Sequence, residues 1–125
     1  MSGLCLTAAA LMVSLPLQVF TLSWTHSIEK ILWEEDYRIA GNALVLTEAR
    51  IRGSGAGMEP PDGALLKDGV WHYTPALSTL PHLRLARSPF TADYKLCWHG
   101  ACHPMAEFMG PADAMVPVDL SVCPS

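Results

Sequence analysis

Apolar and polar residues alternate strictly along residues 20–29, which have the sequence Phe-Thr-Leu-Ser-Trp-Thr-His-Ser-Ile-Glu. Alternate residues of an extended strand share one face, so Phe20, Leu22 and Trp24 lie together and His26 continues that face. The pattern predicts a strand over residues 20–26. It also makes His26 a candidate functional residue, because a core-facing position normally carries a hydrophobic side chain.

Similar short extended segments recur along the chain, separated by Gly, Pro and Asn. We expect them at residues 31–39, 43–51, 70–74, 83–87, 92–97, 102–108 and 116–122. Gly41 and Asn42 predict a hairpin between the second and third strands, residues 52–69 predict a loop because they are rich in glycine and proline, and Pro117 favours an edge position for the last strand. The predicted class is all-β, a small antiparallel β-sandwich or partly closed barrel of about seven or eight short strands.

The N-terminal part of the chain is uncharged, and its first charged side chain is Glu29. We therefore expect a hydrophobic helix before the β domain, with residues 1–19 acting as a signal peptide or membrane anchor and residues 20–125 forming a single domain. No Lys or Arg lies near Met1, so cleavage and anchoring both stay open, as does a buried helix of a cytosolic protein. Cys5 lies too near the start to be a convincing lipid acceptor. Export would place the protein outside the cytoplasm.

Length and charge limit the function further. The 125 residues suffice for one core but not for two. Eight scattered basic residues against twelve acidic ones give a net charge of −4, which argues against nucleic acid as a partner. The consecutive acidic residues Glu34, Glu35 and Asp36 predict a solvated strand edge, where charge discourages pairing with another chain.

The cysteines support export. Cys97 and Cys102 flank a four-residue segment that contains Gly100, an arrangement suited to a disulfide across a β-hairpin. We predict that bridge. Cys123 then remains as a buried thiol or as a competitor for one of the two partners.

Two motifs resemble a known family. Residues 25–29 have the sequence Thr-His-Ser-Ile-Glu and residues 53–58 the sequence Gly-Ser-Gly-Ala-Gly-Met. With this spacing the chain resembles the bacterial domain-of-unknown-function family numbered 1850. The resemblance implies a small exported or anchored protein that assists a tripartite ATP-independent periplasmic transporter, with its membrane or substrate-binding subunits as partners. It implies no catalytic activity and no cofactor.

The motifs contain the residues that we expect to contact a ligand or partner. A glycine-rich loop can direct consecutive backbone N–H groups at an anion, and Arg50 and Arg52 precede this loop directly. A small carboxylate would then be held by His26 and Arg52 as donors, with Glu29 orienting His26. The full set is His26, Ser27, Glu29, Arg52, Gly53, Gly55, Gly57 and Met58. Alternatively, the glycines only permit positive φ in a crossover, and His26 and Glu29 bond to backbone at a strand end.

Other classes of function are open as alternatives. Cysteine, histidine and methionine are ligands for copper or zinc, so Cys97, His99, Cys102, His103 and Met105 are an alternative metal module, although the disulfide would remove two ligands. A purely structural assembly factor is a third class. A hydrolase is disfavoured, because His26 and its neighbour Ser27 point to opposite faces of a strand.

Overall fold

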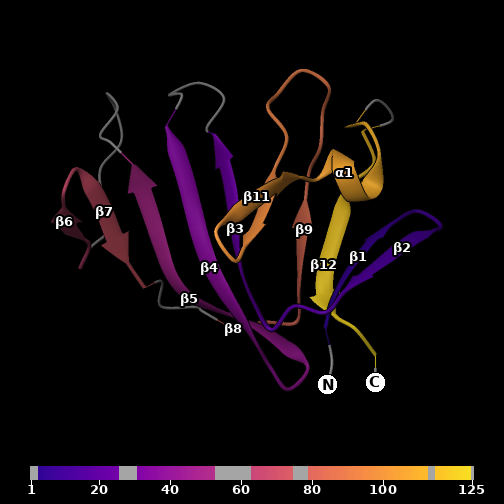
Figure 1. The fold of residues 1–125 in the computed structure, drawn as a ribbon, viewed down its shortest axis with the longest axis horizontal. Helices are drawn as coiled ribbons and strands as arrows, with labels where there is room; N and C mark the ends of the chain where they lie inside the picture. Colours follow the sequence, from indigo (N-terminus) through magenta and orange to yellow (C-terminus); the bar gives the residue numbers. More distant parts are fainter. Residues whose placement is uncertain (1–2, 26–30, 53–62, 75–78, 113–114, 125) are drawn as a thin grey trace.

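The computed structural model describes residues 3–25, 31–52, 63–74, 79–112 and 115–124, which form two antiparallel sheets and one short helix, α1 (Ala106–Met109) (Figure 1). The larger sheet contains, in spatial order, β11 (Ala101–Pro104), β10 (Lys95–Trp98), β3 (Val19–Thr25), β4 (Leu32–Ala40), β5 (Ala43–Arg52), β7 (Val70–Tyr73) and β6 (Leu65–Lys67), with β8 (Thr79–Leu80) beside β5. The smaller sheet contains β2 (Leu11–Leu15), β1 (Leu4–Ala8), β12 (Val118–Val122) and β9 (His82–Leu85). Both sheets are open. The predicted all-β class is confirmed, with more strands than the seven or eight expected.

The centre of the larger sheet follows the sequence pattern closely. The expected strands at residues 20–26, 31–39 and 43–51 correspond to β3, β4 and β5, each antiparallel to the next. Gly41 has a φ of 62° at the turn between β4 and β5, a conformation that glycine adopts without strain. The register shifts once, between Asp36 and Tyr37. The predicted hairpin is therefore confirmed.

The core lies between the two sheets. Phe20, Leu22 and Tyr37 on one face of the larger sheet belong to the same buried cluster as Leu4 and Leu120 of the smaller sheet. We call this face of the larger sheet the inner face. The opposite face, which carries Glu34, Asp36 and Arg50, is the outer face.

The expected N-terminal helix is not seen. Its residues instead form β1 and β2, which pair with each other, and β1 also pairs with β12. Leu4, Cys5 and Leu6 are all buried. Hydropathy cannot distinguish a buried strand from a buried helix, and here pairing with the distant β12 selects the strand. No helix in the described part of the chain is long and apolar enough to span a bilayer.

Three further expectations need correction. The last strand, β12, lies between β1 and β9 rather than at an edge, because Pro117 precedes the strand and removes no hydrogen bond from it. β6 forms within the predicted loop. The acidic residues 34–36 lie in β4, at the centre of the larger sheet and not at its edge.

Two disulfides close the fold. Cys97 and Cys102 are directly opposite on β10 and β11 and are bonded, as predicted. Cys123 is neither a free thiol nor a competitor, because it pairs with Cys5 across a sequence separation of 118 residues. A disulfide that closes so long a loop restricts the unfolded chain strongly. Two structural disulfides are typical of an oxidising compartment.

Candidate functional site

Both motifs are attached to the same end of the larger sheet. β3 and β5 run in the same direction because each is antiparallel to β4, and Thr25 and Arg52 are both paired with Leu32. Neighbouring strands are about 4.8 Å apart, so the backbones of Thr25 and Arg52 lie roughly 10 Å apart. We call this end, at the top of the larger sheet in Figure 1, the loop end. The motif residues His26, Ser27, Glu29, Gly53, Gly55, Gly57 and Met58 lie outside the described residues.

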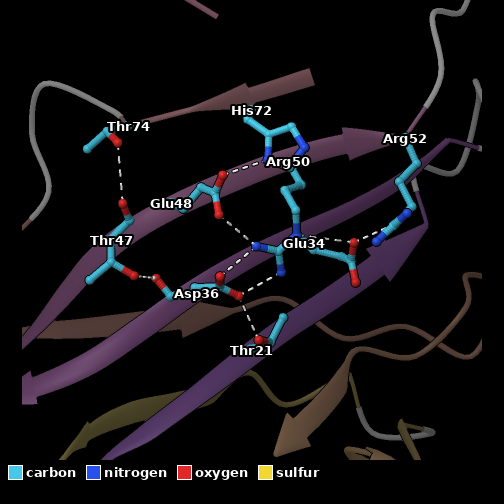
Figure 2. Close-up of polar contacts among 9 residues, drawn as sticks. All are labelled: Thr21, Glu34, Asp36, Thr47, Glu48, Arg50, Arg52, His72 and Thr74. Carbon is cyan, nitrogen blue, oxygen red and sulfur yellow. Dashed lines mark hydrogen bonds and ion pairs between the residues drawn. The ribbon is translucent and has the colours of Figure 1, made fainter. Parts of the chain in front are cut away.

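A network of charged side chains covers the outer face near the loop end, centred on Arg50 (Figure 2). Arg50 Nη2 donates to Asp36 Oδ1 at 2.7 Å, and Arg50 Nη1 donates to Glu48 Oε2 at 3.1 Å. Its Nε lies 3.5 Å from Glu34 Oε1. One guanidinium therefore faces three carboxylates from two adjacent strands.

The network perturbs the two groups at its centre in the directions expected of a strong pair. The hydrogen bond to Asp36 raises the pKa of Arg50, and burial only partly opposes this. For Asp36, burial acts to raise the pKa, but hydrogen bonds from Arg50 and Thr21 outweigh it, so the pKa lies below its usual value. Arg50 is thus fixed within the fold, with only 16% of its side chain exposed.

Two more bases extend the network toward the surface. His72 Nδ1 lies 2.6 Å from Glu48 Oε1, within hydrogen-bonding distance. Arg52 Nε donates to Glu34 Oε1 at 2.6 Å. The Arg52 side chain is 47% exposed, far more than that of Arg50. Arg52 is therefore oriented by Glu34 and still accessible.

A shallow basic pocket lies beside Arg52. Its volume is about 310 Å³, and it is lined by Arg50, Arg52, Lys67, Asp68, Val70 and His72. Lys67 comes from the edge strand β6 and forms no ion pair with any residue that the structure describes. Neither terminal nitrogen of Arg52 bonds to another described residue, since its one bond there uses Nε.

This arrangement is chemically suited to an organic anion. The terminal nitrogens of a guanidinium match the two oxygens of a carboxylate, and a lysine adds a mobile positive charge. The predicted residue Arg52 thus lies in a pocket at the base of the segment that carries the glycine-rich motif. Arg50, which precedes the same motif, is occupied by its three carboxylates.

Sequence analysis missed Lys67 and His72. His72 lies on β7, directly opposite Arg50. Lys67 is the last residue of β6, a strand that we predicted to be part of a loop because the surrounding sequence is rich in glycine and proline. The polar position of His72 between Trp71 and Tyr73 was a signal, because it places His72 on the face opposite to both aromatic residues.

The alternative metal module is not supported by the described residues. Cys97 and Cys102 are bonded to each other, and the Met105 side chain is fully buried. His103 Nδ1 lies 2.8 Å from Glu107 Oε2, and the His103 ring stacks on the Trp98 ring. Within the described ranges, no group of three or more His, Cys, Asp or Glu side chains could hold a metal ion.

A family model covers residues 20–105, which include all of β3 except Val19, the strands β4 to β11 and both motifs. It is the model of a domain of unknown function, DUF1850, and the chain belongs to that family. No curated protein and no solved structure matched the chain.

Proposed function

We propose that this chain is a periplasm-facing accessory protein of a tripartite ATP-independent periplasmic transporter, and that it binds a small carboxylate at the basic pocket. The observation that carries the proposal is the state of Arg52. Glu34 orients its Nε, its terminal nitrogens bond to no other described residue, and its side chain lines the same pocket as Lys67.

Three lines of evidence support this role. The chain belongs to the DUF1850 family, and the resemblance to that family implies an association with such transporters. Its two disulfides fit an oxidising compartment such as the periplasm. Arg52, which lines the basic pocket, directly precedes the glycine-rich motif in the sequence.

The first test is a thermal-shift screen of the full chain with both disulfides intact, against acetate, succinate, glutamate and related acids. A ligand at 100 times its dissociation constant adds about 2.7 kcal/mol to the free energy of unfolding, so a carboxylate that binds raises the melting temperature clearly. We expect Arg52→Gln combined with Lys67→Gln to abolish this rise.

The matched control is Arg84→Gln. Arg84 is also an arginine held by a carboxylate, Asp119, but it lies on the smaller sheet. It should leave the thermal shift unchanged. A panel without any shift would refute carboxylate binding at the concentrations used. Association with transporter subunits would then be tested separately, by co-purification of the oxidised chain with each subunit.

A further inference from the structure

Glu35 is a charged residue on the apolar inner face. Its direct neighbours across the strands are Leu22 on β3 and Ala49 on β5, and Tyr73 of β7 continues the same row. Ala49 is completely buried and Leu22 nearly so. Burial raises the pKa of Glu35, although a hydrogen bond from Tyr37 partly opposes the rise. The fold therefore keeps a carboxylate where an apolar residue would be more stable.

The described residues provide no cation for this carboxylate. The Tyr37 hydroxyl donates to Glu35 Oε1 at 2.9 Å, and no Lys, Arg or His of the described ranges forms an ion pair with it. Tyr73 and Tyr94 lie near enough that the charge of Glu35, after burial, raises the pKa of each. Burying a carboxylate that has no counter-ion among the described residues costs free energy.

Aromatic rings gather beside Glu35. Trp24 and Trp33, which are directly opposite on the inner face, stack with their centroids 6.0 Å apart, and Tyr94 contacts Trp24 at 5.8 Å. The indole N–H of Trp33 is buried and has no hydrogen-bond partner among the described residues. The side chains of Glu35, Trp24, Trp33, Tyr73 and Tyr94 are only partly buried, so they retain surface that a ligand can cover.

We propose that Glu35 and these aromatic side chains form a binding site for an alkylammonium group. A carboxylate supplies the counter-charge, and the faces of Trp and Tyr rings attract a cation through their quadrupole, most strongly where water is excluded. The site lies on the inner face, opposite the basic pocket, so it is independent of the carboxylate site. The two faces of one sheet end would then bind ligands of opposite charge.

The test is calorimetric titration of the full oxidised chain with choline and tetramethylammonium. The neutral isostere of choline, 3,3-dimethylbutanol, is titrated in parallel. We expect saturable binding of both cations and none of the neutral alcohol. Glu35→Gln, which keeps the shape and can still accept the Tyr37 hydrogen bond, should weaken choline binding at least about tenfold, the change that 1.4 kcal/mol produces.

Three further variants separate the site from general effects on the fold. Tyr94→Leu, which removes a ring but leaves the carboxylate, should weaken binding, whereas Tyr94→Phe should retain it. Glu107→Gln removes the same charge at an exposed position on α1 and should change nothing. Equal binding of choline and its neutral isostere, no binding of either cation, or unchanged affinity in Glu35→Gln would overturn the proposal.

Discussion

On the outer face of the larger sheet, three carboxylates surround the guanidinium of Arg50, whereas on the inner face Glu35 has only a tyrosine hydroxyl as its described partner. Glu34, Glu35 and Asp36 are consecutive, so strand alternation alone sends the middle one to the opposite face. The pKa values of these adjacent carboxyl groups are therefore shifted in opposite directions: that of Asp36 is lowered and that of Glu35 is raised. Position in the sheet, not residue type, decides whether a charge stabilises the fold.

Removing Arg50 should disrupt the charged network on the outer face and have the largest effect on stability. Arg50→Met leaves three carboxylates close together without their shared cation. We expect the free energy of unfolding to fall by about 2 kcal/mol at pH 7, since each charge-assisted hydrogen bond contributes about 1.5–3 kcal/mol and the carboxylates are partly solvated. Urea unfolding measures it. Arg84→Met, on an exposed pair, should have a much smaller effect; an equal loss would show that the network adds nothing beyond a surface pair.

Asp36→Asn tests the pH response of the outer face. The lowered pKa of Asp36 means that its contribution to stability is present above the unfolded pKa, near 3.9, and is lost as the pH falls through the folded value. We expect a loss of about 1 kcal/mol at pH 7 that shrinks below about pH 4. Unfolding titrations at several pH values measure it. A difference independent of pH would contradict the assignment of this effect to charge.

Glu35→Gln should change the stability at pH 7 in the opposite direction to Asp36→Asn. Because the pKa of Glu35 is raised, its ionisation opposes folding, and stability is lost as the pH rises from the unfolded value, near 4.3, through the folded one. We expect the variant to be more stable than the wild type at pH 7 by up to about 1 kcal/mol, discounted for partial exposure, with no charge-related gain below about pH 4. The same titrations measure it. Destabilisation at pH 7 would mean that the carboxylate has a stabilising partner.

Arg52→Gln should have the smallest effect on stability. The Arg52 side chain is 47% exposed in its pair with Glu34, so the change should stay within about 0.5 kcal/mol. The expected loss is in ligand binding instead. Parallel thermal unfolding with and without a carboxylate distinguishes these effects. A large drop in stability without ligand would assign Arg52 to the fold rather than to a site.

The sequence predicted the central strands because each pattern there is local. Alternation placed β3, β4 and β5, and the spacing of Cys97 and Cys102 predicted their bond. Prediction from the sequence failed where a strand or cysteine pairs with a segment that is distant in the chain. The strand β1 depends on β12, and the Cys5–Cys123 bridge joins segments 118 residues apart.

The site was predictable to a similar degree. Arg52 was identified because it adjoins the glycine-rich motif, but Lys67 and His72 enter through strand pairing that no local pattern reveals. The alternation that made residues 31–39 a strand also placed Glu35 among apolar neighbours. Its significance emerges only from the buried row formed with Leu22 and Ala49.

The most direct test of carboxylate binding is calorimetric titration of the wild type, Arg52→Gln and Arg84→Gln with the acid that gives the largest thermal shift. The account predicts saturable binding with one site, weakened at least about tenfold in Arg52→Gln, as loss of a charged bidentate contact would require, and unchanged in Arg84→Gln. Equal affinity in all three proteins, or no heat of binding in the wild type, would contradict it.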